Sequence, residues 1–175
     1  MPGPVFRNGE RVELRTVEEE DVEFPQQTVN DPRVRRNVFL TDPMNRQQER
    51  EWVDALGQDG GYHFLVCDDG MPVGIAGLDD PVETWGRAET GYVIQPQYWD
   101  SGYATDALRE LCCYAFEERR YNKVVARAYE TNPASRRVLE KVGFTEEGVF
   151  RAEAFVDGEF VDVHRYGLLS GEFDP

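Results

Sequence analysis

The chain has 175 residues, of which 40% are hydrophobic and 12% aromatic, so it can bury the core of one domain. No apolar stretch is long enough to span a bilayer, and the first ten residues lack the basic start and apolar core of a signal peptide. We therefore expect a single domain over residues 1–175 that is cytoplasmic and has no membrane partner.

The charge balance is strongly acidic: 34 acidic residues stand against 19 basic ones, giving a net charge of −15. Phosphate binding needs clustered Lys and Arg, so this balance argues against a nucleic-acid partner. The acidic residues are spread along the whole chain, and only Lys123 and Lys141 are lysines. This pattern is typical of halophilic archaeal proteins and predicts such an origin, while a surface field that attracts cationic substrates stays open as an alternative.

The three cysteines, Cys67, Cys112 and Cys113, occur in no CxxC or Cys/His spacing that would bind a metal. We expect reduced thiols and no metal site. The adjacent pair is interpreted as small residues that pack within a helix, because a reactive thiolate needs a basic neighbour that the local sequence does not supply.

The first elements are a strand and two helical segments. Alternating apolar residues predict a strand at Arg11–Arg15, with Thr16 as the cap of a helix whose acidic first turn is Glu18–Asp21. Asp31–Asp42 is expected to form a loop or a broken helix. A second helix is predicted from Asn45 to Leu56.

The apolar face of that second helix is expected to consist of Trp52, Val53 and Leu56. Three strands are predicted to follow it as an antiparallel meander, with Asp68-Asp69-Gly70 as the first hairpin turn. These strands are Tyr62–Cys67, Val73–Leu78 and Glu89–Ile94.

The clearest helix is Tyr103–Arg119, whose apolar residues recur at helical spacing, which predicts its burial. After it we expect a strand at Lys123–Tyr129, a short helix at Pro133–Val142 and a hairpin that turns at Asp157-Gly158. The whole pattern predicts a mixed α/β domain, of the α+β kind, built on a largely antiparallel sheet.

A candidate anion site lies where a strand ends and the clearest helix begins, in the segment Tyr98–Ala104. A helix N-terminus offers unpaired amides and a positive dipole end, which suits a pyrophosphate, and Gly102 allows a ligand to approach the backbone closely. The alternative is that Asp100 or Ser101 merely caps the helix.

A second motif is Asn132-Pro133-Ala134-Ser135, which combines a capping residue with proline at the first helical position. Capping alone would explain it. The functional alternative is that the Ser135 hydroxyl projects into a cleft and donates a proton to a leaving group. Gly143-Phe144 then ends this helix and anchors the next strand.

The order and spacing of these motifs resemble the GNAT superfamily of N-acetyltransferases, specifically its RimJ/RimL-like branch of ribosomal-protein N-terminal acetyltransferases. The resemblance runs from about Arg11 to Leu169 and includes the closing hairpin, Arg151 to Leu168. It implies a GNAT fold with six to seven strands and about four helices. It also implies that strands 4 and 5, Glu89–Ile94 and Lys123–Tyr129, splay apart to open a cleft.

The resemblance implies acetyl-CoA as cosubstrate and assigns its contacts. The pyrophosphate is expected at the backbone amides of Asp100, Ser101, Gly102, Tyr103 and Ala104. The pantetheine arm is expected to pair with the strand segment of Tyr92, Val93 and Ile94, and Asn132 to bind one of its amides.

A protonated amine cannot attack a thioester, so the reaction needs a base. Glu89 is the first candidate and Glu130 the second, although either could be a solvated acid at a strand end. Backbone amides of Val93 or Ile94 are expected to bind the oxyanion. Ser135 takes the role of proton donor by analogy with the branch, because Leu139 stands where the wider superfamily often has a tyrosine.

The preferred acceptor is the α-amine of a protein N-terminus, because the resemblance points there. A polyamine, an amino acid or an aminoglycoside is the alternative acceptor, and a non-catalytic module that binds acyl-CoA is the alternative outside enzymes. Asp100, which replaces the usual glycine of the phosphate loop, is a feature in favour of that module. Homodimers are common in the family, so a homodimer is a further expectation.

Overall fold

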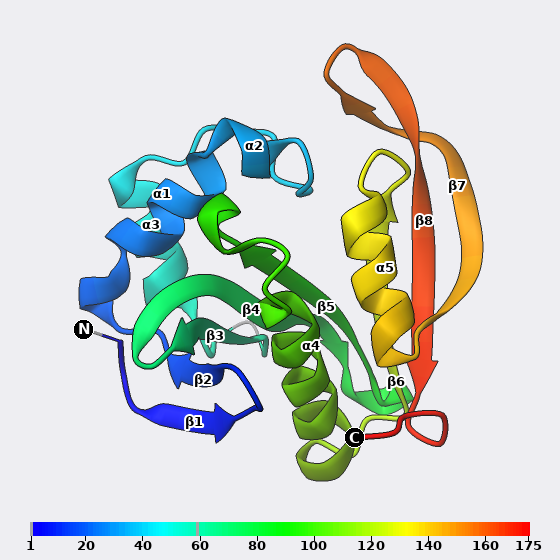
Figure 1. The fold of residues 1–175 in the computed structure, drawn as a ribbon, viewed down its shortest axis with the longest axis horizontal. Helices are drawn as coiled ribbons and strands as arrows, with labels where there is room; N and C mark the ends of the chain where they lie inside the picture. Colours follow the sequence, from blue (N-terminus) through cyan, green and yellow to red (C-terminus); the bar gives the residue numbers. More distant parts are fainter. Residues whose placement is uncertain (1, 59) are drawn as a thin grey trace.

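The computed structural model describes residues 2–58 and 60–175, which form one eight-stranded sheet with helices on both faces (Figure 1). The strands lie in the order β1-β2-β3-β4-β5-β6-β8-β7, and only β5 and β6 are parallel neighbours. The strands are β1 (Val5–Asn8), β2 (Glu13–Thr16), β3 (Tyr62–Asp68), β4 (Met71–Val82), β5 (Arg87–Ile94), β6 (Lys123–Tyr129), β7 (Thr145–Val156) and β8 (Glu159–Leu169). The prediction of six to seven strands was too low, because the short edge strand β1 has no alternating pattern.

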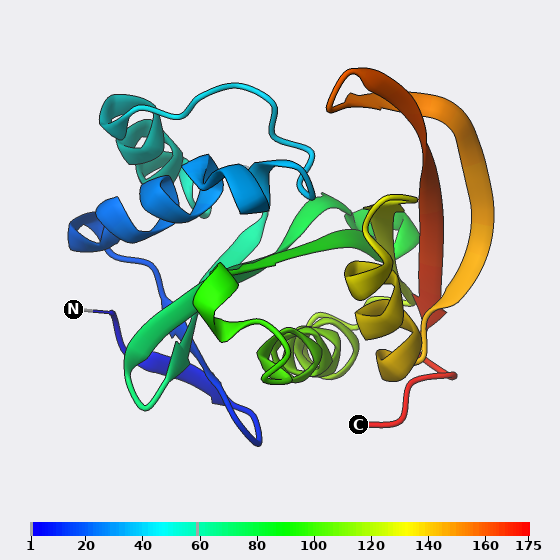
Figure 2. The ribbon, with the colours of Figure 1, turned by 45° about the horizontal axis from the view of Figure 1, so that its top comes forward.

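The helices divide between the two faces of the sheet (Figure 2). The blue and cyan helices α1 (Glu23–Asn30), α2 (Pro32–Arg35) and α3 (Arg46–Ala55) cover one face, and α4 (Tyr103–Cys113) and α5 (Pro133–Val142) cover the other. No helix in these described residues is long and apolar enough to cross a membrane.

The predicted cap Asn132 was confirmed, the predicted cap Thr16 was wrong, and Asn45 is a cap that was not predicted. The side chains of Asn45 and Asn132 accept hydrogen bonds from the first turns of α3 and α5. Thr16 does not cap a helix, since it ends β2 and its hydroxyl donates to Glu18 Oε1 over 2.6 Å. The helical path begins at Glu18 instead, whose N–H donates to the carboxylate of Asp21 over 3.0 Å.

Both predicted hairpin turns were confirmed. Asp69 and Gly70 have φ angles of 47° and 75°, and Asp157 and Gly158 have φ angles of 50° and 92°. A turn with two positive φ angles matches the right-handed twist of the strands that it joins, and Asp-Gly is among the pairs that adopt this conformation most readily. The turns therefore fix the registers of β3 with β4 and of β7 with β8.

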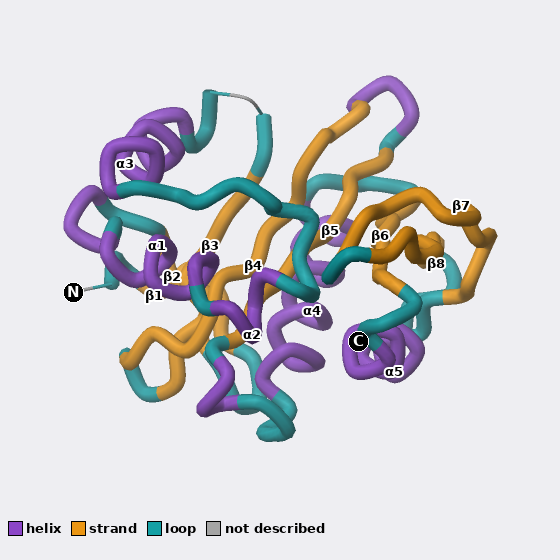
Figure 3. The backbone as a smooth tube through the Cα atoms, turned by 90° about the horizontal axis from the view of Figure 1, so that it is seen from above, coloured by secondary structure: helices purple, strands orange, loops and turns teal. Residues whose placement is uncertain are grey.

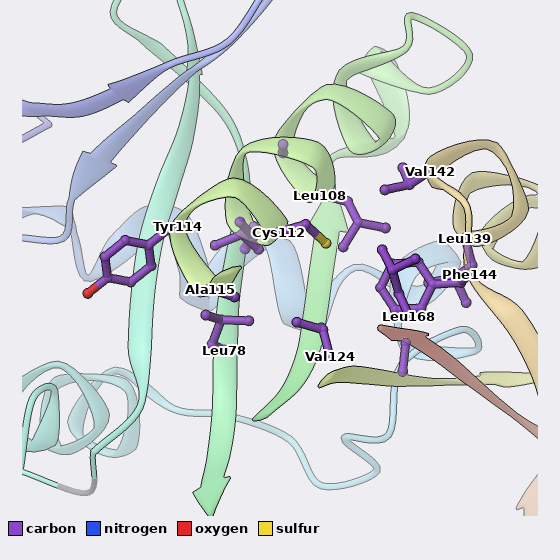
Figure 4. Packing of buried hydrophobic residues seen from close by; sticks show 14 of the residues in the cluster. Leu78, Leu108, Cys112, Tyr114, Ala115, Val124, Leu139, Val142, Phe144 and Leu168 are labelled. Carbon is purple, nitrogen blue, oxygen red and sulfur yellow. The ribbon is translucent and has the colours of Figure 1, made fainter. Parts of the chain in front are cut away.

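The main core lies between α4 and the sheet (Figure 4). Leu108, Leu111 and Cys112 of α4 are fully buried and belong to the same cluster as Leu78 of β4 and Leu168 of β8. The predicted helix Tyr103–Arg119 is α-helical as far as Cys113 and continues as one π-helical turn from Tyr114 to Glu118. Its predicted burial is confirmed.

Strands β5 and β6 separate, as the resemblance to the GNAT family implied. Their parallel pairing covers only three residue pairs, which start with Arg87 and Lys123 and end with Glu89 and Val125. Beyond this point β5 continues to Ile94 and stays paired with β4, whereas β6 continues to Tyr129 and stays paired with β8. The edge of β5 that faces β6 is therefore free of strand partners from Thr90 to Ile94.

Asp106 fixes the start of α4 to the β1–β2 turn. Its side chain is buried, and its carboxylate accepts hydrogen bonds from the backbone N–H groups of Glu10 (3.2 Å), Arg11 (2.7 Å) and Val12 (3.0 Å). Gly9 lies against the same carboxylate, where a Cβ would come within 2.5 Å of Asp106 Oδ2. Apolar periodicity could not predict this buried acid.

We predict that Asp106→Ala lowers the free energy of unfolding by about 2 to 4 kcal/mol, because it removes the charged acceptor of three backbone amides, of which that of Val12 is buried. Urea unfolding followed by circular dichroism measures the change. Asp174→Ala, at an exposed position near the C-terminus, is the control. A variant at Asp106 as stable as this control would contradict the assignment.

Candidate active site

A cleft of about 1210 Å³ opens where β5 and β6 separate. Every site residue that the sequence proposed lines it. These residues are Glu89, Tyr92, Val93, Ile94, Asp100, Ser101, Gly102, Tyr103, Ala104, Asn132 and Ser135. The structure thus brings the proposed residues to one place, and their individual roles remain predictions. Glu130, the second candidate base, is not among the lining residues, and its carboxylate accepts the N–H of Asp162 over 2.8 Å.

The loop before α4 leaves the first amides of the helix open. The alternative that Asp100 or Ser101 caps α4 is wrong, because Gly102 occupies the cap position and no side chain bonds to the first turn. Asp100 has a φ of 60° and Gly102 a φ of 82°. Asp100 thus holds the left-handed conformation for which glycine is best suited, and its carboxylate lies on an exposed residue.

Besides Arg127, four basic side chains that the sequence reasoning did not single out line the same cleft: Arg11, Arg109, Arg137 and Lys141. Arg11 Nη1 donates to the Ser101 carbonyl over 3.5 Å, and Arg11 Cδ lies 3.5 Å from the place of a Cβ on Gly102. Arg109 Nε is buried without a hydrogen-bond partner. This group of cations in so acidic a chain fits a ligand with several phosphates.

Tyr92 and Ser135 meet across the cleft although they are 43 residues apart in the chain. Their hydroxyl oxygens are 2.8 Å apart, and Tyr92 also donates to the Ser135 carbonyl over 3.2 Å. Burial raises the pKa of Tyr92 to about 12, so the phenol stays protonated at neutral pH. Leu139, which stands where the wider superfamily often has a tyrosine, is fully buried in the core. The tyrosine hydroxyl beside Ser135 comes from β5 instead.

Asn132 serves as the cap of α5 and still lines the cleft. Its Oδ1 accepts the N–H of Ser135 over 3.1 Å, which fixes the first turn that presents the serine hydroxyl. The capping interpretation of this motif is therefore confirmed. The side-chain amide nitrogen of Asn132 has no part in the cap and is free to donate to a ligand.

Glu89 lies on the opposite face of β5 from Tyr92 and is engaged in an ion pair. Its Oε1 is 2.5 Å from Arg127 Nε, and the Glu89 side chain is 24% exposed. The guanidinium of Arg127 also lies 4.8 Å from the ring centre of Phe39, in the loop between α2 and α3. Arg127 therefore neutralises the first candidate base.

The face of the sheet that α3 covers contains polar groups that sequence reasoning missed. Trp52, Val53 and Leu56 were expected to form the buried face of α3, but they are only half-buried and Glu49 is the buried residue. Burial raises the pKa of Glu49 from 4.5 to about 7. His63 lies on the same face, and its Nε2 lies 2.8 Å from Asp79 Oδ1.

The three cysteines are free and buried, and none is among the described residues that line the cleft. Burial raises the pKa of Cys67 to about 12 and also raises the pKa values of Cys112 and Cys113. The thiols are therefore protonated at neutral pH and lie away from the cleft. These positions argue against a cysteine acyl-enzyme.

We predict that Ellman's reagent modifies no cysteine rapidly in the native protein and modifies all three after unfolding in urea. The thiols react only as thiolates, and the raised pKa values and burial suppress that form. The absorbance of the released thionitrobenzoate measures the number of modified cysteines. A fast-reacting thiol in the native protein would contradict this prediction.

A sheet that splays open beside a helix N-terminus agrees with the fold of the acetyltransferases that the chain resembles. Residues 11–145 match the family model described as the Acetyltransferase (GNAT) domain, and the chain belongs to this family. It is an N-acetyltransferase, and the predictions of the GNAT fold and of acetyl-CoA as cosubstrate are confirmed.

Three relatives illustrate the similarity. The chain is 31% identical to the putative ribosomal N-acetyltransferase YdaF of Bacillus subtilis (strain 168), over 94% of each chain. The spermidine N-acetyltransferase of Vibrio cholerae, solved with CoA and spermine, has a TM-score of 0.88 at 22% identity and covers 93% of this chain and 97% of its own. RimL, a ribosomal L7/L12 α-N-protein acetyltransferase solved with coenzyme A, has a TM-score of 0.85 at 21% identity, over 95% and 98%.

The two solved relatives share the fold and are named for different acceptors, so the likeness leaves the acceptor undetermined. The comparisons also do not establish that the chain belongs to the expected RimJ/RimL-like branch. YdaF and the spermidine enzyme come from bacteria, and they give no support to the expected origin in a halophilic archaeon.

Proposed function

We propose that this chain transfers the acetyl group of acetyl-CoA to the α-amine of a protein or peptide N-terminus. The observation that carries the proposal is the continuation of the cleft into a second hollow of about 350 Å³. Val38 and Leu40 line both spaces. The loop between α2 and α3 extends toward the β7–β8 hairpin before it returns to α3 (Figures 2 and 3). Residues of this loop and of the hairpin line the hollow.

The lining of this hollow suits a peptide better than a polyamine. Arg35 and Arg36 contribute two cations, and Tyr129 and Phe155 contribute aromatic surface. Arg36 is 61% exposed and only loosely paired with Asp157, at 3.9 Å. Cations at this mouth repel the distal ammonium groups of a polyamine, whereas they attract the carbonyl and carboxylate oxygens of a peptide.

The donor half of the cleft supports the assigned contacts of acetyl-CoA. The open amides at the start of α4, together with Arg11 and Arg109, are placed for its phosphates. The free edge of β5 from Tyr92 to Ile94 suits the amides of the pantetheine arm. The side-chain amide of Asn132 is the further donor on the α5 side.

The chemistry follows from groups on the two faces of β5. The amine attacks the thioester carbonyl, the amides of Val93 or Ile94 bind the oxyanion, and the C–S bond breaks. Ser135, hydrogen-bonded to Tyr92, gives the leaving thiolate its proton. Glu89, the base proposed from the sequence, can serve only when the acceptor ammonium displaces Arg127 from its carboxylate.

Acetylation of a small polyamine is the second candidate function. The carboxylates of Glu49, Asp79 and Glu89 line the acceptor face of the cleft and suit a cationic substrate. A non-catalytic module is disfavoured because it has no need of the Tyr92–Ser135 hydroxyl pair in the cleft.

We predict that Ser135→Ala and Tyr92→Phe each lower kcat by about 10- to 100-fold, because each removes part of the proton-donor pair. Affinity for acetyl-CoA, measured by calorimetry, is expected to stay unchanged. Ser170→Ala, exposed beyond β8, is the control. Full turnover in Ser135→Ala would refute the donor role, and binding of acetyl-CoA without turnover of any amine by the wild-type protein would favour the non-catalytic module.

We predict that peptides starting with Ser or Ala and followed by acidic residues release coenzyme A faster than spermidine does. Arg36→Gln is expected to lower kcat/KM for these peptides about three- to tenfold at low salt, with less effect at high salt. Arg50→Gln, an exposed position on α3 outside both spaces, is the matched control. A preference for spermidine, with no effect of Arg36→Gln, would overturn the peptide acceptor.

A further inference from the structure

Glu49 is a buried carboxylate without a partner that lines the cleft. Its residue is 3% exposed, and no described side chain forms a hydrogen bond or ion pair with its carboxylate. Glu49 and Trp52 lie three residues apart on α3, so both face the sheet, and Trp52 packs on the cluster around Leu65 and Ile75. An ionised carboxylate in such a place is costly unless a cation joins it.

The sheet also lines this cleft, through two glycines. Gly77 of β4 and Gly91 of β5 are directly opposite each other, on the same face as Ile75, Asp79 and Glu89. The ring of His63 fills the space above Gly77, where a Cβ would come within 2.6 Å of Cδ2. Above Gly91 a Cβ would meet only Asp79 Oδ2, at 3.8 Å. Gly91 therefore leaves room for atoms of a ligand.

His63 supplies a second unpartnered polar atom in this cleft. Its Nδ1 is buried without a hydrogen-bond partner, while its Nε2 lies 2.8 Å from Asp79 Oδ1. A neutral imidazole whose Nε2–H donates to Asp79 has a bare lone pair at Nδ1, so the network assigns Nδ1 as an acceptor. Trp52 lies edge-on to the His63 ring at 5.4 Å and links it to α3.

One explanation accounts for three observations. Glu49 and His63 Nδ1 have no partner, Gly91 leaves open space, and Glu89 is already paired with Arg127. We propose that the acceptor's ammonium group binds above Gly91, and that the Glu49 carboxylate takes its proton while His63 Nδ1 accepts a second N–H. Glu89 then keeps Arg127 in place and is not the base. The inference rests on the proposed function only in that it requires an amine acceptor.

The proton balance of the reaction is complete with these groups. The first proton leaves the ammonium for Glu49, and the neutral amine forms the C–N bond. The second proton leaves the nitrogen of the tetrahedral intermediate and replaces the one that Ser135 gives to the thiolate as the C–S bond breaks. Glu49 returns its proton to solvent, so one proton is released per acetyl group transferred.

The surroundings of Glu49 suit a base that works near neutral pH. Burial alone raises its pKa to about 7, and no charged neighbour contributes. The titratable groups on the elements around it are engaged elsewhere: Asp21 accepts the N–H of Glu18, Glu23 pairs with Arg46, and His63 pairs with Asp79. Protonation below this pKa abolishes the base, so the rate must fall on the acid side.

The first test compares Glu49→Gln with the control Glu51→Gln, an exposed position on the same helix. Glu49→Gln is expected to lower kcat about 30- to 1000-fold and to remove the acid limb of the kcat profile, without changing the affinity for acetyl-CoA. A wild-type rate and profile, or a loss of acetyl-CoA affinity, would overturn the proposal. This measurement can use any amine that the wild-type protein acetylates. A failure of the peptide proposal is therefore detected separately, because the wild-type protein would then prefer spermidine.

A stability measurement tests the buried carboxylate without any acceptor. The folded state holds a proton on Glu49 at pH values where the unfolded chain has lost it, between 4.5 and about 7. Stability therefore falls as pH rises through this window, and the change from acid to neutral pH should be smaller in Glu49→Gln than in Glu51→Gln. Identical pH dependences of Tm in the two variants would refute an ionising, unpartnered Glu49.

Gly91→Ala tests the proposed place of the amine. The added Cβ fits the fold because its nearest neighbour is at 3.8 Å, but it occupies the place assigned to the amine. The expected result is a KM for the acceptor raised about tenfold or more with an unchanged Kd for acetyl-CoA. An unchanged acceptor KM would place the amine elsewhere and overturn the proposal.

Discussion

The structure depends on a parallel strand pairing that stops after three residue pairs. Strand β5 cannot follow β6 further, because β4 holds it from Arg87 to Ile94 and β8 holds β6 along its whole length. The gap is thus maintained by sheet hydrogen bonds on both outer sides and needs no ligand to open it. The first turns of α4 and α5 both lie at this gap, which explains why open amides, a serine hydroxyl and a free strand edge share one cleft.

The two faces of β5 separate the two halves of the chemistry. The side chain of Tyr92 points to the face covered by α4 and α5, where it contacts Ser135. Glu89 and Gly91 lie on the face covered by α1 and α3. Arg11, Arg109, Arg137 and Lys141 line the part of the cleft beside α4 and α5, although Glu10, Asp100 and Asp106 line the cleft there as well. A net charge of −15 therefore conceals a local group of cations that suits an anionic cosubstrate.

Local signals were sufficient for most of the fold, whereas the resemblance to the GNAT family supplied most of the proposed site residues. Alternating strands, two Asp-Gly turns and the caps Asn45 and Asn132 act over a few residues, and the sequence displays them directly. The pairs Tyr92–Ser135 and Glu89–Arg127 join residues 43 and 38 positions apart, and no local pattern encodes them. Glu49 was missed for another reason: a helix pattern places charged residues in solvent, and this one is buried. Local inconsistency of this kind is expected at functional sites.

The division of the site between separate elements has a consequence for how such enzymes diverge. The donor half is built from β5, α4 and α5, which also carry much of the core, so substitutions there endanger folding. The second hollow is built from the α2–α3 loop and the tip of the β7–β8 hairpin, where insertions and exchanges are tolerated. Under the proposed function, changes in these two peripheral segments alter the acceptor while the site of the acetyl donor is retained.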